Sequence, residues 1–450
     1  MAVSASFGAK TGFSLGLPAG VRVTSTQKAH PQADWKNLMK RISALTVLLG
    51  VLLSPVVLFA KVTTRVPRHT RSARVQESSR TSKRIHSMQH SRPVGRGQLR
   101  RASLVRTSAR GRHHRVYERF TGSSFVDTDL ANGDTTSGED QVVRQAAIDA
   151  LGNMNGTVVA IDPNNGRVLA MVNQKLALSE GAEPCSTIKL SVALAALEER
   201  IVTKDTPVNL GGHYSLNMTE ALAHSNNAYF ETLGRRLGFE RVKHYANEFG
   251  LGEYAGYNIK GEHLGVYPTE ALPDAQGGVG RMCSFGEGVS VTPLQLGALV
   301  ASIANGGTLF YLQHPETPDE VLNFKPMVKR MLDIGPLIPE IVPGMGAAVQ
   351  YGTARSVRAS FSEFPVLGKT GTCSNNGTRF GWFASFADTP SGRIVVVFFL
   401  EGGRPTFGPK AAELAGHFYR NLSDKSYFTT AKNTPPSAEK QAAVSTGVTQ

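Results

Sequence analysis

Glu183-Pro184-Cys185-Ser186-Thr187-Ile188-Lys189, with the apolar, helix-favouring run that follows it to Arg200, is the stretch around which the chain is organised. In Ser186-x-x-Lys189 the hydroxyl and the amine lie three residues apart, so on a helix they share one face. Pro184 is compatible with the turn that opens a helix, and the positive end of the helix dipole favours an alkoxide at Ser186 and a lowered Lys189 pKa. The stretch therefore predicts a serine nucleophile with a lysine base.

Two further motifs follow in a set order. Ser-x-x-Lys alone is a weak pattern, because chance matches are expected in a chain of 450 residues. Downstream come Ser225-Asn226-Asn227, a Ser-x-Asn, and then Lys369-Thr370-Gly371-Thr372, a Lys-Thr-Gly followed by a small hydroxylated residue. This ordered triplet is typical of penicillin-binding proteins and serine β-lactamases. Its chance occurrence is very low, so the three motifs are interpreted as parts of one active site.

The region around the motifs resembles a penicillin-binding protein transpeptidase domain, over roughly residues 140–422. Stretches similar to the family's lie at residues 161–171, 220–230, 285–288, 292–295, 305–307 and 352–354. The resemblance implies an α+β, β-lactamase/transpeptidase-like fold, in which an antiparallel sheet is flanked by helices and stands beside a helical lobe.

The residue pattern itself predicts a sheet assembled from both ends of the domain. Strands are expected at 157–162 and 167–172, joined by Pro-Asn-Asn-Gly, and again at 380–387 and 393–400. A closing helix is expected at 409–422. The first two motifs lie in the helical middle.

The resemblance implies a catalytic role for four residues. Ser186 attacks the carbonyl of a D-alanyl-D-alanine-like peptide and forms an acyl-enzyme, with Lys189 as the base. Ser225 relays a proton to the departing amine. Lys369, kept charged, orients Ser225 and attracts the substrate carboxylate.

The same resemblance implies a substrate-binding set made of Asn227, Thr370, Gly371 and Thr372. Asn227 holds the substrate amide, and the hydroxyls of Thr370 and Thr372 bind the carboxylate. The backbone N–H groups of Ser186 and Thr372 form the oxyanion hole. No cofactor and no metal site are expected.

The three cysteines, Cys185, Cys283 and Cys373, permit one disulfide and leave one thiol over. A subgroup of class A β-lactamases has a bridged cysteine pair at the positions that correspond to Cys185 and Cys373, so the resemblance implies a disulfide between these two. The alternative is that each is a small buried thiol. Cys185 also stands where the family usually has Gly.

The net charge of +14 resembles a nucleic-acid signal, but its distribution argues against one. Between residues 61 and 120 there are 17 Lys and Arg against two Glu, so the rest of the chain is close to neutral. Dispersed arginines without interleaved aromatics form no base-reading surface, so no nucleic-acid partner is expected. The basic segment is either a solvated spacer or a contact for anionic lipids or acidic envelope polymers.

Residues 42–60 carry no charged side chain over 19 positions, which is long enough to span a bilayer. We therefore expect a disordered cytoplasmic leader at 1–41, a transmembrane signal anchor at 42–60, a basic disordered linker at 61–137, the transpeptidase domain at 138–422 and a disordered tail at 423–450. The basic residues on the two sides of the apolar run do not settle its orientation, so we place the catalytic domain outside the inner membrane because the substrate that the resemblance implies lies there. A start at Met39 would instead make the apolar run a signal peptide that is cleaved near Ala60.

The sequence leaves several functions open. The first is a membrane-tethered D,D-transpeptidase that cross-links peptidoglycan stem peptides and binds penicillin covalently. A D,D-carboxypeptidase or a serine β-lactamase would use the same acyl-enzyme and resolve it with water. A non-catalytic β-lactam sensor or division scaffold would form the acyl-enzyme without turnover.

Overall fold

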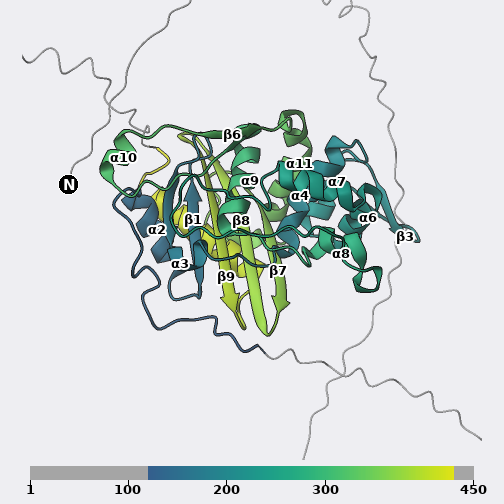
Figure 1. The fold of residues 1–450 in the computed structure, drawn as a ribbon, viewed down its shortest axis with the longest axis horizontal. Helices are drawn as coiled ribbons and strands as arrows, with labels where there is room; N and C mark the ends of the chain where they lie inside the picture. Colours follow the sequence, from purple (N-terminus) through teal and green to yellow (C-terminus); the bar gives the residue numbers. More distant parts are fainter. Residues whose placement is uncertain (1–119, 430–450) are drawn as a thin grey trace, which may run out of the picture. The chain divides into compact units, whose positions relative to one another are not determined.

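A five-stranded antiparallel sheet forms the centre of the computed structural model, which describes residues 120–429 (Figure 1). Its strands are β1 (Gly156–Ile161), β2 (Val168–Val172), β7 (Val366–Asn375), β8 (Thr378–Thr389) and β9 (Gly392–Gly402), in the order β2-β1-β9-β8-β7. Every neighbouring pair in the sheet is antiparallel. Because β1 lies beside β9, the sheet joins strands from both ends of the domain, and the expected architecture is confirmed.

The sheet is covered on both faces, which explains the continuous apolar run in β9. Residues 394–400 of this strand are all buried. On one face lie α2 (Gln141–Leu151) and the closing helix α12 (Gly408–Asp424), which share an apolar cluster with the sheet. Asp140 caps α2 by accepting from the backbone N–H groups of Val142 and Val143.

The other face packs against α9 (Pro293–Asn305) and the helical lobe, which share the larger apolar cluster. A capping box between Thr292 and Gln295 starts α9, and the helix is buried over almost its whole length. The lobe contains α4 (Lys189–Glu198), α5 (Met218–Ala223), α6 (Asn227–Leu237), α7 (Phe239–Glu248), α8 (Gly278–Phe285) and α11 (Ile338–Gln350).

Smaller elements connect these layers. They are α3 (Gln174–Ala177), η1 (Cys185–Ile188), β3 (Val208–Gly211), β4 (Tyr214–Leu216), η2 (Asp274–Gln276), β5 (Thr308–Phe310), α10 (Pro318–Leu322), β6 (Val328–Met331), η3 (Gly335–Leu337) and η4 (Arg355–Ala359).

The folded part extends beyond the expected bounds of 138 and 422 at both ends. Phe125 pairs with Met154 in an antiparallel bridge, and the buried Ser124 hydroxyl lies 2.8 Å from the hydroxyl of Thr406. At the other end, Phe428 is buried against the α12 side of the sheet. Composition suggested a linker up to residue 137, but the backbone pairing that holds this segment has no compositional signal.

The expected leader, the apolar run at 42–60 and most of the basic linker and tail lie outside the described residues. Within residues 120–429, no helix has both the length and the apolar character that a membrane crossing requires.

Candidate active site

The nucleophile candidate Ser186 lies in the short helix η1, which leads directly into α4 at Lys189. The Thr187 hydroxyl donates to the Pro184 carbonyl at 2.6 Å, so this neighbouring hydroxyl is held by the backbone. Lys189 Nζ lies 2.7 Å from Ser186 Oγ. The three-residue spacing therefore brings hydroxyl and amine together as the helical geometry requires.

The Lys189 side chain is fully buried and surrounded by oxygen atoms. Its Nζ lies 3.0 Å from the Ser225 carbonyl, 3.1 Å from Ser225 Oγ and 2.6 Å from Asn227 Oδ1. Burial holds the Lys189 pKa well below its usual value, and the charge of Lys369 lowers it further, while Glu231 acts in the opposite direction. The amine is therefore suited to the neutral form, which can accept a proton from Ser186.

Ser225 lies in the turn between α5 and α6, where its hydroxyl sits between two amines. Ser225 Oγ accepts a hydrogen bond from Lys369 Nζ at 2.8 Å, in addition to its contact with Lys189 Nζ. Asn226 caps α6 by accepting from Tyr229 N, and this cap places Asn227 in the first turn with its side chain on Lys189. Ser225 is thus placed to pass a proton between the reacting centre and either amine.

Lys369 lies within β7 and has no exposed surface. Within the described residues, its Nζ donates hydrogen bonds only to Ser225 Oγ and to the Thr370 carbonyl. Because burial removes water from the ammonium, the Lys369 pKa is lowered to about 7. The resemblance implies a charged Lys369, and a pKa of about 7 makes this charge dependent on pH near neutrality.

The rest of the Lys-Thr-Gly-Thr strand presents hydroxyl groups along β7. Thr370 Oγ1 donates to Thr353 Oγ1 at 2.7 Å. Thr372 Oγ1 accepts from the backbone N–H of Gly408 at 2.8 Å, which leaves its own proton available for a ligand. Sequence reasoning missed Thr353 as a site residue, although Gly352-Thr353-Ala354 had been noticed as a stretch similar to the family's.

Gly371 brings the strand close to the nucleophile. A Cβ at this position would lie 2.9 Å from the Pro184 carbonyl oxygen and 3.2 Å from Thr187 Cγ2. A side chain would therefore push β7 away from η1, which explains in physical terms why glycine stands between Thr370 and Thr372.

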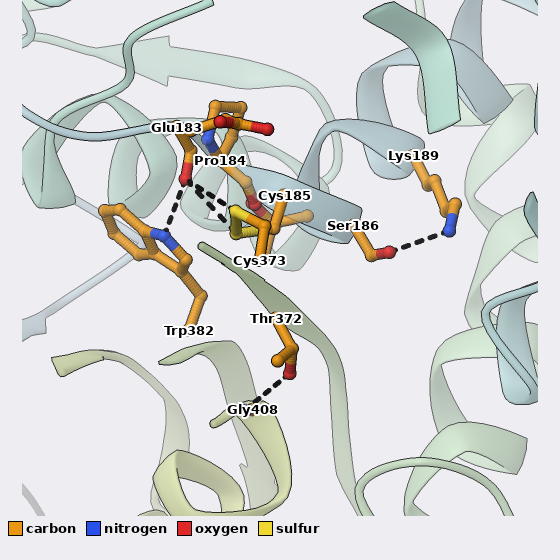
Figure 2. The surroundings of a disulfide bond; sticks show 10 residues. Glu183, Pro184, Cys185, Ser186, Lys189, Thr372, Cys373, Trp382 and Gly408 are labelled. Carbon is orange, nitrogen blue, oxygen red and sulfur yellow. Dashed lines mark hydrogen bonds between the residues drawn. A yellow bond between two sulfur atoms is a disulfide. The ribbon is translucent and has the colours of Figure 1, made fainter. Parts of the chain in front are cut away.

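A disulfide joins Cys185 and Cys373, the residues directly beside Ser186 and Thr372 (Figure 2). Their Cα atoms lie 5.5 Å apart, within the range that a disulfide needs. Cys283 is free and buried. The indole Nε1 of Trp382 donates to the Glu183 carbonyl at 3.0 Å, which fixes the start of the nucleophile segment against β8.

The structure thus gathers all the residues that the sequence selected for the site: Ser186, Lys189, Ser225, Asn227, Lys369, Thr370, Gly371, Thr372, Cys185 and Cys373. Within residues 120–429, no group of three His, Cys, Asp or Glu side chains is placed to hold a metal ion.

Residues 156–422 match the family model described as the penicillin binding protein transpeptidase domain. The chain is 29% identical to stage V sporulation protein D of Bacillus subtilis, in a match that covers 58% of this chain and 48% of that protein. It is 25% identical to the peptidoglycan D,D-transpeptidase MrdA of Acinetobacter baumannii, over 64% of this chain and 54% of the relative. The chain therefore spans about half the length of these curated relatives.

Two solved structures share the fold. Pseudomonas aeruginosa PBP2, in complex with WCK 5153, aligns with a TM-score of 0.53 and 23% identity over 64% of this chain and 77% of its own. The D,D-transpeptidase domain of a peptidoglycan glycosyltransferase from Eggerthella lenta aligns with a TM-score of 0.52 and 20% identity over 66% of this chain and 87% of its own. Both likenesses agree with the antiparallel sheet and helical lobe described above.

Proposed function

Because the chain belongs to the penicillin-binding protein transpeptidase family, we propose that it is a serine-type D,D-transpeptidase that cross-links peptidoglycan stem peptides through an acyl-enzyme on Ser186. The observation that carries this proposal is the placement of the Lys189 amine, 2.7 Å from Ser186 Oγ and 3.1 Å from Ser225 Oγ in a buried site. A desolvated lysine beside a hydroxyl is an activated nucleophile pair.

In the acylation step, Ser186 Oγ attacks the carbonyl carbon of the penultimate D-alanine, and its proton moves to the neutral Lys189 amine. The oxyanion that forms is bound by the N–H groups of Ser186 and Thr372, where one donor is worth about 3 kcal/mol. Collapse of this intermediate breaks the peptide bond. The departing D-alanine amine takes the proton through Ser225, which lies within hydrogen-bond distance of Lys189.

The substrate carboxylate binds at the Lys369 end of the site. The ammonium form of Lys369 attracts it, and the Thr372 hydroxyl donates to it. The Thr370 hydroxyl, whose proton is on Thr353 Oγ1 in the free site, turns to donate to it as well. Thr353 adds a hydroxyl to this set through its contact with Thr370. Asn227 presents its carbonyl oxygen to Lys189, so its amide N–H group remains available for a substrate carbonyl.

The acyl-enzyme is resolved by the amine of a second stem peptide, which enters where D-alanine left and loses its proton along the same path in reverse. Water in place of the amine would make the protein a carboxypeptidase. A β-lactamase is less well supported, because the Glu262 carboxylate accepts from the backbone N–H groups of Ala255 and Gly256 at 2.9–3.1 Å and so holds its own loop.

We further propose that the folded part works outside the inner membrane, with residues 42–60 as a single-pass anchor or as a signal peptide cleaved near Ala60. The Cys185–Cys373 bridge supports an oxidising compartment. β-Lactam antibiotics are the expected covalent inhibitors. The basic segment that starts at residue 61 would contact anionic lipids or envelope polymers.

A Ser186→Ala variant tests the proposal. It should lose covalent labelling by a fluorescent penicillin and turnover of a pentapeptide that ends in D-Ala-D-Ala. The other hydroxyl beside Lys189, that of Ser225, lies in the turn between α5 and α6, and the Thr187 hydroxyl donates to the Pro184 carbonyl. Thr187→Ser is the matched control and should keep the label. Persistent labelling of Ser186→Ala would refute the assignment, whereas rapid penicillin hydrolysis by the unmodified protein would identify a β-lactamase.

A further inference from the structure

The roles proposed for Lys369 and Thr372 determine the direction in which a donor peptide lies along β7. β7 is the last strand in the sheet order, and within the described residues no strand pairs with its second edge, where a peptide can add as a further strand. The carboxylate end of the peptide belongs at Lys369, and the reacting carbonyl belongs at Thr372. The residues that precede the D-Ala-D-Ala pair must then run past Cys373 toward Asn375.

A cavity of about 430 Å³ lies at that end of the strand. It is lined by residues 372–375 of β7 together with Glu183, Arg281, Phe285, Glu287 and Gly288. The donor residue before the D-Ala-D-Ala pair would place its side chain here.

A second cavity of about 420 Å³ shares Glu183, Gly288 and Asn375 with the first. Its lining also includes Phe380, Phe399 and Glu401. The combined space is apolar in part and carries acidic groups, so it fits an aliphatic chain that ends in a positive charge.

The charges around the first cavity do not cancel. Arg281 pairs with Glu287 through two nitrogen atoms, each 2.7 Å from the same carboxylate oxygen. Within residues 120–429, no hydrogen bond or ion pair reaches the Glu183 carboxylate. Burial, and next the charge of Glu287, raise the pKa of Glu183 to about 7, while the charge of Arg281 acts in the opposite direction. A cation beside this carboxylate would remove the cost of its charge.

The backbone of Glu183 is fixed more firmly than its side chain. Trp382 holds its carbonyl oxygen, and the bridged Cys185 follows two positions later. In Figure 2 the carboxylate lies on the side of the residue away from the indole. The chain therefore presents a carboxylate on a fixed backbone that accepts no hydrogen bond within the described part, and the opposing charge of Arg281 is shared with Glu287.

We propose that Glu183 binds a primary ammonium group on the side chain of the donor residue that precedes the D-Ala-D-Ala pair. This inference rests on the proposed function, because the direction of the donor peptide comes from the roles of Lys369 and Thr372. Glu183 acts as a specificity residue: it selects the donor and takes no part in bond making.

Competition against penicillin labelling of the full-length protein tests the inference. The two competitors are Nα-acetyl-lysyl-D-Ala-D-Ala with a free side-chain amine and the same peptide with that amine acetylated. The free amine should halve the labelling rate at a concentration about 10-fold lower, since a charge-assisted hydrogen bond is worth about that factor or more. Glu183→Gln should bring the ratio of the two concentrations close to one, and Glu183→Lys should invert it.

Glu180→Gln is the matched control, because it removes an exposed carboxylate three residues away that lines neither cavity. It should keep the unmodified ratio. Equal competition by the two peptides in the unmodified protein would overturn the inference without any variant, and so would an unchanged ratio in Glu183→Gln. Failure of a penicillin to label the unmodified protein would instead overturn the proposed function itself.

Discussion

At the scale of single residues, the site contains two backbone conformations that L-amino acids rarely adopt. Cys185 has φ 51° and Ser225 has φ 54°, and each lies in or next to a catalytic motif. Such strain persists where the surrounding structure over-determines it. Here the disulfide holds Cys185, and hydrogen bonds to two lysines hold Ser225. No residue type in either motif predicts a positive φ. The sequence therefore identified the hydroxyl groups of the site but not the backbone conformation of Cys185 and Ser225.

Acylation by a carboxylate-bearing penicillin should slow as the pH rises through about 7. Burial lowers the Lys369 pKa to about 7, so the ammonium that attracts the carboxylate is present below this pH and lost above it. The measurement is the pH profile of the second-order acylation rate, which reports on groups of the free enzyme. Lys189 must be neutral to act as the base, and burial lowers its pKa in the direction that favours this form.

A penicillin methyl ester is the control for the Lys369 titration, because it lacks the carboxylate. Its acylation rate should not fall through the same range. A fall of equal size with the ester, or a flat profile with the acid between pH 6 and 8, would argue against the carboxylate role of Lys369.

At the scale of elements, the strands were predictable where hydrophobic runs are long. Residues 380–387 and 393–400 were expected as strands and lie within β8 and β9. The burial of Lys369 was not predictable, because a lysine in a strand usually faces solvent. β7 packs against α11, α12 and η1, and the Ser225 turn contacts the Lys369 amine, which has no exposed surface. A local pattern identifies an element, but which of its faces is covered depends on elements distant in sequence.

Gly371→Ala should reduce the penicillin acylation rate by about 100-fold, the cost that a displacement near 1 Å can have in a positioned active site. The added Cβ would meet the Pro184 carbonyl oxygen at 2.9 Å and force β7 away from η1. Gly346→Ala is the matched control, since its Cβ would come no closer than 4.0 Å to Leu367 and it lies in a helix. This control should keep its acylation rate and unfold at the same or a slightly higher temperature. Normal acylation by Gly371→Ala would show that the strand tolerates the displacement.

At the scale of the whole molecule, the order of the three motifs along the chain was enough to predict the fold class, and the matching family model confirms that resemblance. The limits of the folded part were harder to predict. Residues 120–126 follow a basic run and show no helix or strand periodicity, yet Val126 N donates to the Asn153 carbonyl and Thr121 N to the Gly377 carbonyl. Backbone pairing of this kind is independent of side-chain type, so composition cannot reveal where such a segment begins.

The disulfide affects both the stability of the whole fold and the active site, because it closes a loop of 188 positions that includes the helical lobe and ends beside Ser186 and Thr372. Replacing Cys185 and Cys373 together by Ala should lower the free energy of unfolding by up to about 5 kcal/mol, from the chain entropy that the closed loop removes. Acylation by penicillin should slow as well, since the oxyanion-hole donors of Ser186 and Thr372 lie next to the bridged residues. Denaturant unfolding and the acylation rate measure the two effects on one sample.

Cys283→Ala separates the bridge from the loss of a buried sulfur atom. Cys283 is free, and its sulfur lies 2.6 Å from where a Cβ on Gly234 would stand, so the variant leaves a small cavity in the lobe without opening the loop. The variant should lower the free energy of unfolding by roughly 1 kcal/mol and keep normal acylation.

The number of free thiols tests the bridge directly. Alkylation of the unfolded, unreduced protein followed by mass spectrometry should give one modified thiol. Three modified thiols would mean that the bridge does not form, and the stabilisation and the alignment of the oxyanion hole would then have to come from packing alone.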